Sequence, residues 1–460
     1  MATENHAAKD NNDAEETITV VANDAQQSAT SGYQPLSSST ATLTSMPLLD
    51  IPQVVNTVSD RVLEDQHATS LDEALYNVAN VVQTNTLGGT QDAFTRRGFG
   101  ANRDGSIMTN GLRTVLPRSF NAATERVEVL KGPASTLYGI LDPGGLINVI
   151  TKRPERQFSG SVSGTSTSFG GGTGSVDVTG PIEGTNLAYR LIGEYQNEDY
   201  WRNFGKNKSR FIAPSLTWFG DRATVTASYS HRDYSAPFDR GTIFDLNTGH
   251  AVNVDRKTRF DEAFNITDGY SDLAQLNAEY RLNDAWTARF DYSYSQDHYN
   301  DNQARVMAYD SATGNLTRRV DGTHGSTQKM HSTRADLQGN VVVGGFYNEL
   351  LTGVAYENYD LLRTDMLRCK NVKGFNIYHP VYGTLDTCNT VSASDSDQRI
   401  QQESYAAYVQ DALYLTDNWI AVAGVRYQYY TQYAGKGDRL TSIPTAAMRN
   451  GRRKPAWSTK

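Results

Sequence analysis

Apolar and polar residues alternate with a period of two between about residue 157 and residue 435. Successive side chains of a β-strand point to opposite faces, so each such segment carries one apolar and one polar face. The alternation is clearest at residues 223–230, 275–282, 287–294 and 333–343. An apolar, Tyr-rich face opposite a charged or amide face is typical of a wall between lipid and a wet lumen. The pattern therefore predicts an antiparallel transmembrane β-barrel.

About eleven strands of this kind fit between Gln157 and Tyr433. Short turns such as residues 181–184 alternate with long polar loops, which favours a membrane barrel. A water-soluble β-sandwich or solenoid would alternate too and is the competing interpretation. No apolar run reaches the roughly 18 residues that a membrane-spanning helix needs, so any passage through a membrane depends on strands.

Residues 44–156 have the mixed texture of a compact α/β domain. A capping box at residues 70–73 precedes apolar residues at helical spacing and predicts a helix from about Leu71. The apolar series consists of Leu71, Leu75, Val78 and Val82. β-prone runs predict strands at residues 54–59, 126–130 and 146–151.

Residues 1–43 are polar and predict a flexible tail. One β-prone hexapeptide interrupts this tail: Glu16, Thr17, Ile18, Thr19, Val20 and Val21. Taken alone, it could equally be a first strand of the next domain. Met1 to Glu15 is polar and acidic, without the basic start and apolar stretch of a secretory signal, so we expect no export signal in the chain as written.

The alternation ends abruptly at residues 436–460, an atypical basic tail. Seven basic residues stand there against the single acidic residue Asp438. Three interpretations fit: a solvated tail, a basic anchor for anionic lipid, or a shifted reading frame in which the original strands are missing. An incomplete set of strands would leave bare edges, which a bilayer does not tolerate.

Several motifs occur in order over about 110 residues and together resemble the plug domain of TonB-dependent outer-membrane siderophore receptors. They are residues 52–55 (PQVV), 96–99 (RRGF), 110–113 (NGLR), 125–139 (ERVEVLKGPASTLYG), 143–148 (PGGLIN) and 151–154 (TKRP). Residues 16–21 resemble the family's TonB box, and the alternating region resembles the first half of its barrel. Within that family, the sequence most resembles receptors for ferric hydroxamates of the ferrichrome type.

The resemblance implies an α/β plug domain (residues 44–156) followed by a transmembrane β-barrel (157–435) with about half of the 22 or so strands of plugged transporters. It further implies an outer-membrane location in a Gram-negative bacterium. The implied function is import of a ferric siderophore into the periplasm, driven by TonB and its inner-membrane energising complex, and compromised if the chain is truncated. A non-functional fragment and a plugged barrel for haem or a vitamin complex are the alternatives.

Candidate ligand contacts are an arginine beside the plug motif and aromatic or basic residues in loops, because aromatic rings can stack on an amphipathic chelate. They are Arg97, Arg118, Phe120, Trp201, Tyr234, Phe238, Tyr299 and Tyr309. For Arg97 and its neighbour Arg96, pairing with wall carboxylates is an equally strong interpretation. For the aromatic residues, a lining or girdle role competes with direct contact.

The remaining sequence features bear on metal binding, catalysis, nucleic-acid binding and disulfide formation. The eight histidines lack metal-site spacing, and we expect no metal and no cofactor, because a siderophore fills the coordination shell of iron itself. No Gly-x-Ser-x-Gly elbow or phosphate loop is present, so we do not expect an enzyme. The net charge of −8 argues against nucleic acid as a partner. Cys369 and Cys388 lie in one predicted loop; a disulfide there is expected, and two unpaired thiols are the alternative.

Overall fold

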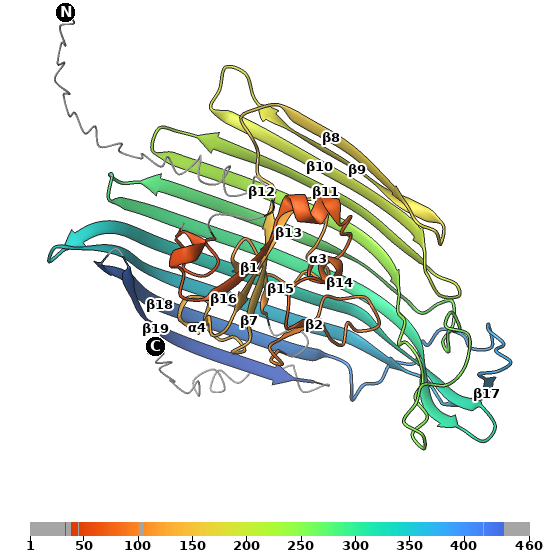
Figure 1. Cartoon of the computed structure of the whole chain (residues 1–460). Helices are drawn as coiled ribbons and strands as arrows, with labels where there is room; N and C mark the ends of the chain where they lie inside the picture. Colours follow the sequence, from red (N-terminus) through yellow and green to blue (C-terminus); the bar gives the residue numbers. More distant parts are fainter. Residues whose placement is uncertain (1–32, 34–37, 45, 101–104, 417, 437–460) are drawn as a thin grey trace, which may run out of the picture.

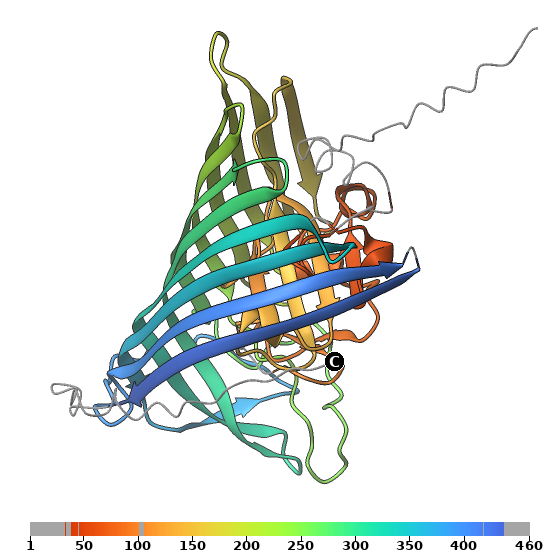
Figure 2. The same ribbon diagram turned by 90° about the vertical axis from the view of Figure 1, so that its left-hand side faces the viewer.

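The computed structural model describes residues 33, 38–44, 46–100, 105–416 and 418–436. The described chain folds into a small mixed sheet with short helices and a large curved antiparallel sheet that wraps around one side of it (Figures 1 and 2). Within the described residues, no helix is long and apolar enough to cross a membrane. The segment Glu16–Val21 and residues 437–460 lie outside the described residues.

The small part contains eleven elements, most of them short. They are η1 (Leu48–Asp50), β1 (Val54–Val58), α2 (Asp60–Asp65), α3 (Leu71–Ala74), β2 (Val81–Gln83), β3 (Phe94–Arg96), β4 (Ile107–Thr109), β5 (Leu112–Arg113), β6 (Thr124–Lys131), α4 (Ser135–Tyr138) and β7 (Gly145–Thr151). Five strands form a sheet in the order β1-β6-β7-β4-β5, in which only the β4–β7 pair is parallel. The strands expected near residues 54–59, 126–130 and 146–151 are therefore confirmed as β1, β6 and β7.

The helix expected from Leu71 is confirmed only for its first turn. Helix α3 ends at Ala74, and the Ser70 side chain makes no capping hydrogen bond. The Glu73 carboxylate instead accepts hydrogen bonds from the backbone N–H and the hydroxyl of Thr69, at 2.7 and 2.8 Å. Val82, the last residue of the expected apolar face, lies in β2 and is exposed.

The large sheet contains the remaining twelve strands of the described chain. They are β8 (Ser159–Ser166), β9 (Gly171–Pro181), β10 (Leu187–Asp199), β11 (Lys206–Phe219), β12 (Ala223–Pro237), β13 (Ile266–Arg281), β14 (Trp286–Asp310), β15 (Asn315–Val343), β16 (Phe346–Arg368), β17 (Val372–Asn376), β18 (Gln398–Thr416) and β19 (Trp419–Gly435). Eleven of them follow one another in sequence order, and β17 pairs with β15 off this path. The predicted fold class is confirmed, with β8 and β19 as the two edges of the described sheet (Figure 2).

The period-two pattern places apolar residues on the convex face and polar residues on the concave face. On β11, Ile212, Leu216 and Trp218 point outward and are 40–48% exposed, whereas Thr217 is buried on the inner face. On β13, the inward-pointing Gln275 donates a hydrogen bond to the Thr109 carbonyl of the small part at 3.2 Å. The outer face thus suits lipid, and the inner face bonds to the chain that it surrounds.

The two ends of the large sheet differ in the length of their connections. At one end the strands are joined by tight turns, at residues 182–186, 220–222, 282–285 and 344–345. At the other end lie the connection 238–265 and the segment between β16 and β18, in which Cys369 and Cys388 form a disulfide with Cα atoms 5.8 Å apart. Outer-membrane barrels have short periplasmic turns and long extracellular loops, so the long-loop end is the extracellular end.

Two clusters of buried apolar side chains hold the small part together and fix it to the wall. One packs α2 and α3 against β1, β6 and β7, with Leu71, Val127 and Ile147 at its centre. The other joins Met108 and Leu130 of the small part to Leu351 and Tyr408 of the large sheet, and so crosses the boundary between them. The small part is therefore docked against the wall through a shared core.

We predict that Gly145→Ala disrupts the β6–β7 pair. Gly145 has a φ of +106°, and an added Cβ would lie 1.9 Å from the Leu130 carbonyl oxygen. We expect a loss of about 3 kcal/mol of local stability, seen as faster amide exchange in β6 and β7. Gly98→Ala is the matched control, because Gly98 has a φ of +78° and open space around its Cβ position. Equal exchange in the two variants would contradict the prediction.

Candidate functional site

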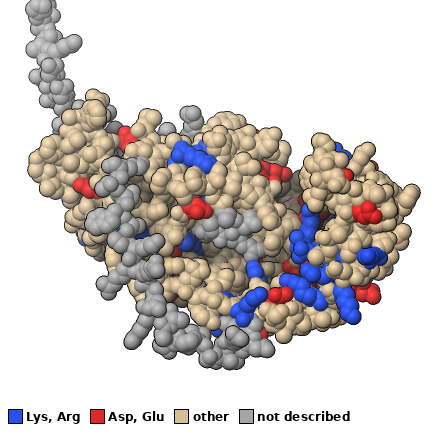
Figure 3. Space-filling model, turned by 90° about the horizontal axis from the view of Figure 1, so that it is seen from below, with Lys and Arg blue, Asp and Glu red and all other residues tan. Residues whose placement is uncertain are grey.

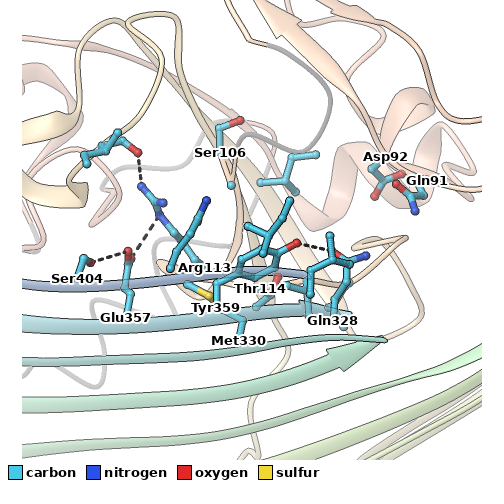
Figure 4. A pocket seen from close by; sticks show the side chains of 18 of the residues that line it. Gln91, Asp92, Ser106, Arg113, Thr114, Gln328, Met330, Glu357, Tyr359 and Ser404 are labelled. Carbon is cyan, nitrogen blue, oxygen red and sulfur yellow. Dashed lines mark hydrogen bonds and ion pairs between the residues drawn. The ribbon is translucent and has the colours of Figure 1, made fainter. Parts of the chain in front are cut away.

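A cavity of about 440 Å³ lies between the small part and the inner face of the wall (Figure 4). The small part contributes residues 91–94, 96, 105–107 and 113–117 together with Ile140. The wall contributes inward-pointing side chains of β15, β16, β18 and β19, and also Glu403 of β18, which lies between two inward positions. The cavity therefore forms where loops of the small part meet four strands that are distant in sequence.

The wall side of the cavity follows the period-two pattern of the strands. Inward positions two residues apart supply Gln328 and Met330 of β15, Glu357, Tyr359, Leu361 and Arg363 of β16, Ile400, Gln402 and Ser404 of β18, and Gln428 and Tyr430 of β19. The Tyr359 hydroxyl donates to Gln328 Oε1 at 3.0 Å. The lining thus combines apolar and aromatic surface with a few polar groups, as small-molecule sites do.

One ion pair across the cavity joins the small part to the wall. Arg113 Nε lies 3.3 Å from Glu357 Oε1, and both side chains are at most 19% exposed. A further Arg113 nitrogen donates to the Tyr138 carbonyl at 3.3 Å and to the Ile140 carbonyl. Ser404 donates to the second Glu357 oxygen at 3.4 Å (Figure 4). Because both charges are shielded from water, losing either partner would leave the other buried without compensation.

Two further charged residues shape the floor of the cavity from the small part. Arg96 is almost fully buried, and its guanidinium donates to the carbonyls of Gly145 and Phe94, both at 3.0 Å. Asp92 accepts from Arg118 Nη1 at 3.1 Å and from the Ser119 amide at 2.7 Å. Burial raises the pKa of Asp92, although Arg118 and the Ser119 amide act in the opposite direction.

The expected plug contacts lie around the cavity rather than in it. The Arg97 side chain is exposed and lies beside Lys131 and Gly132, whereas its neighbour Arg96 lines the cavity. Arg118 does not line the cavity, but it forms an ion pair with Asp92, which does. Phe120 packs at the margin of the apolar cluster under β1, β6 and β7.

The expected barrel aromatics lie in the wall or in the loops. Tyr299 and Phe238 are buried, and the Tyr234 hydroxyl donates to Asp297 at 2.8 Å. Trp201 is partly exposed beside Arg202 and Arg256, and Tyr309 packs at the edge of a loop cluster. None of the eight expected contact residues lines the described cavity.

Sequence reasoning missed the inward positions of β16 and β18 and the role of Arg113. The signal for Arg113 was present, because it closes the NGLR motif at residues 110–113. The signal for the wall was the polar phase of the alternation, which marks inward positions along each strand but not their height in the barrel.

A buried ionic cluster in the extracellular loops stands over the small part. Asp239 donates its backbone N–H to the Gly88 carbonyl at 2.8 Å and pairs with Arg202 at 2.7 Å. Arg259 pairs with Asp261 at 2.6 Å. Burial raises the pKa of Asp261 to about 6, with the nearby Asp239 carboxylate adding to the effect and Arg259 opposing it.

Two family profiles match this chain. The profile of the TonB-dependent receptor plug domain matches residues 47–146, and that of the TonB-dependent receptor-like β-barrel matches residues 211–458, more than half of the chain. The chain belongs to the TonB-dependent receptor family. Its small part is the plug, and its large sheet is wall of the barrel.

Relatives in this family are receptors for metal chelates. The chain is 29% identical to the metal-pseudopaline receptor CntO of Pseudomonas aeruginosa over 87% of its own length and 57% of the relative. It is 27% identical to the catecholate siderophore receptor Fiu of Escherichia coli K12 over 96% of its own length and 61% of the relative. It is 26% identical to the ferrioxamine B receptor of Salmonella typhimurium, covering 84% of the chain and 56% of the relative.

The fold is shared with solved receptors. The ferric preacinetobactin receptor BauA of Acinetobacter baumannii superposes with a TM-score of 0.80 at 21% identity, covering 90% of this chain and 63% of that one. The chain thus spans less than two thirds of the proteins it matches. TonB-dependent receptors are outer-membrane β-barrel proteins of Gram-negative bacteria, and receptors rather than enzymes, so the predicted outer-membrane location is confirmed.

We predict that ionisation of Asp261 weakens the loop cluster. The pKa of Asp261 is about 6 in the folded chain against an ordinary 3.8, so the folded loop binds more protons between these values. Its stability therefore falls as the pH rises from about 4 to 6, by an amount of the order of 2 kcal/mol. We expect Asp261→Asn to remove this dependence, measured as the free energy of loop opening from amide exchange corrected for intrinsic rates.

Asp255→Asn is the control for this experiment, because Asp255 is an exposed carboxylate of the same loop. It should keep the pH dependence of the unsubstituted chain. An unchanged pH dependence in Asp261→Asn would show that another group is responsible.

Proposed function

We propose that this protein binds a ferric siderophore at the extracellular side of the plug and imports it into the periplasm. The observation that carries the proposal is the cavity of about 440 Å³ enclosed between plug loops and the inner wall of a TonB-dependent receptor. Its mixed apolar, aromatic and polar lining suits a compact amphipathic chelate. The relatives described above are named as receptors for metal-pseudopaline, ferrioxamine B and catecholate siderophores.

The plug must move for the ligand to pass, and several polar contacts resist that movement. Asn110 donates to Gln275 of β13 at 2.7 Å, and the Val115 amide donates to Ser295 of β14 at 3.0 Å. The outer membrane holds no ion gradient or nucleotide of its own, while a nanomolar ligand is bound by about 12 kcal/mol. The work of release has to come from the inner membrane, which is the role we assign to TonB and its energising complex.

The segment Glu16–Val21 is the handle that we propose for TonB. An extended β-prone peptide can add as a strand to the sheet edge of a partner through main-chain hydrogen bonds. Further along the chain, Ser38 and Thr40 are buried, and their hydroxyls donate to the Glu128 carboxylate in β6. The Thr40 carbonyl accepts from the Tyr138 hydroxyl at 2.8 Å. Force on the tail would therefore reach the centre of the plug sheet directly.

The proposed division of the chain follows these roles. The sequence predicts residues 1–43 as the tail with the TonB box, 44–156 as the plug, 157–435 as the barrel wall and 436–460 as a basic tail. Residues 38 and 40–43 depart from a flexible tail, because their side chains are buried against the plug. A ferrichrome-type hydroxamate stays the prediction made from the sequence for the ligand. The relatives differ in the chelate for which they are named, so the charge of the wall is the better guide to ligand class.

Uptake of radioactive ferric siderophores by iron-starved cells that carry this chain in their outer membrane tests the function. We expect uptake that depends on TonB and on the ligand cavity. Binding of ferric complexes without uptake would restrict the chain to a binding role, and no binding of any ferric complex would overturn the proposal.

We predict that Ile18→Pro abolishes capture of the chain by the purified periplasmic domain of TonB. Proline removes a backbone donor and blocks strand addition. Binding of a ferric siderophore should be unchanged, because the hexapeptide precedes the plug by more than twenty residues. Ala29→Pro, in the same tail, should leave TonB capture intact. Equal capture of both variants would show that the handle lies elsewhere.

A further inference from the structure

The extracellular end of the inner wall carries more arginine than acid. Gln303 and Arg305 of β14 point inward there, and Arg319 and Asp321 follow on the neighbouring strand β15. Asp321 accepts from both arginines, with Arg305 at 3.2 Å and Arg319 at 2.7 Å, so one carboxylate serves two guanidinium groups. These three side chains together carry a net charge of +1.

Two more arginines of this region have only neutral hydrogen-bond partners among the described residues. Arg240 donates to Gln303 Oε1 at 2.6 Å, and Arg363 donates to Gln398 Oε1 at 3.1 Å. Neither has a carboxylate at ion-pair distance within the part of the chain that the structure describes. Arg363 Nε is also buried there without a hydrogen-bond partner. Guanidinium groups that carry full charge and spare donors are suited to an anion.

Arg240 and Arg363 approach the ligand path from two sides. Arg363 lines the cavity from β16. Arg240 follows Phe238, whose ring packs on Gly88 of the plug, and its own guanidinium lies 5.2 Å from the centre of that ring. Both arginines lie close enough to the buried Asp301 carboxylate to attract it. The pKa of Arg240 is lowered by burial and by Arg305, as expected where like charges gather.

Seen from below, Lys and Arg side chains gather on the right-hand side of the molecule and are sparser over the rest of this face (Figure 3). Four arginines (Arg240, Arg305, Arg319 and Arg363) lie in this region near three carboxylates: the buried Asp301 and Asp321, and Asp395, which attracts Arg319 from the loop before β18. Glu357, which lines the cavity beside Arg363, is paired with Arg113. The arginines outnumber the nearby carboxylates, and a surplus of positive charge in a partly enclosed entrance attracts anions.

We propose that Arg240 and Arg363 select ferric complexes with net negative charge, such as those with catecholate or carboxylate oxygens exposed around the iron. This inference rests on the proposed function and adds the ligand class. Planar guanidinium donors bind such oxygens with charge-assisted hydrogen bonds. An uncharged hydroxamate complex would gain little from them, so the inference departs from the ferrichrome-type ligand expected from the sequence.

The test compares two iron complexes on the full chain in detergent. The probes are a trianionic ferric tris-catecholate and an uncharged ferric tris-hydroxamate, titrated by quenching of tryptophan fluorescence. We expect the anionic complex to bind at least tenfold more tightly. Arg363→Gln and Arg240→Gln should each weaken its binding about tenfold, the loss of one charge-assisted contact, and leave the uncharged complex unchanged. Arg363→Lys should restore part of the affinity.

Arg222→Gln is the matched control, because Arg222 is exposed in the tight turn between β11 and β12 at the opposite end of the barrel. It removes the same charge and should alter neither affinity. Equal binding of the two complexes, or an equal loss of both in the variants, would overturn the inference and leave the proposed function standing. Failure of both complexes to bind would overturn the two together.

Discussion

The outer face of the large sheet suits lipid, and the inner face contacts the plug. The rest of the structure depends on this difference. Lipid accepts the apolar outer positions but not the polar inner ones, so every inward donor and charge needs a partner inside the wall. Arg334 of β15 illustrates the solution: it pairs with Asp291 at 2.7 Å and Asp336 at 2.9 Å and also reaches the Gly111 carbonyl of the plug at 3.4 Å. The plug therefore supplies hydrogen-bond partners that water would otherwise supply to the inner face of the wall.

In the cavity, some inward side chains of the wall have no plug residue opposite them. Beside the cavity, Gln275 and Ser295 bond directly to plug backbone. At the height of the cavity, Arg113 bridges plug and wall, but the inward side chains beyond it line open space. A ligand that entered there would contact both parts at once. The same contacts that bind the ligand can therefore report its presence to the plug, and through Glu128 to the segment that leads to the tail.

The alternation and the plug motifs were sufficient to predict the fold, because a two-residue period shows directly which side chains face lipid and which face inward. They were not sufficient for the site. Arg113 and Glu357 meet only because the plug docks at one height against β16, which is a long-range property that no local pattern encodes. The aromatic residues chosen for stacking were misleading for the same reason: Phe238 and Tyr299 have the right chemistry, yet neighbouring loops and strands bury them. The helix from Leu71 stopped early because the apolar side chains Leu75 and Val78 reach the plug core without further turns.

The central claim is that ferric complexes bind between the plug and the wall. Locating iron by anomalous scattering, in crystals of this chain grown with a ferric tris-catecholate, tests it most directly. The account predicts one iron peak in the cavity bounded by plug residues 91–94, 96, 105–107 and 113–117 and by strands β15, β16, β18 and β19. A peak on the convex face, or on the loops with the cavity empty, would contradict it.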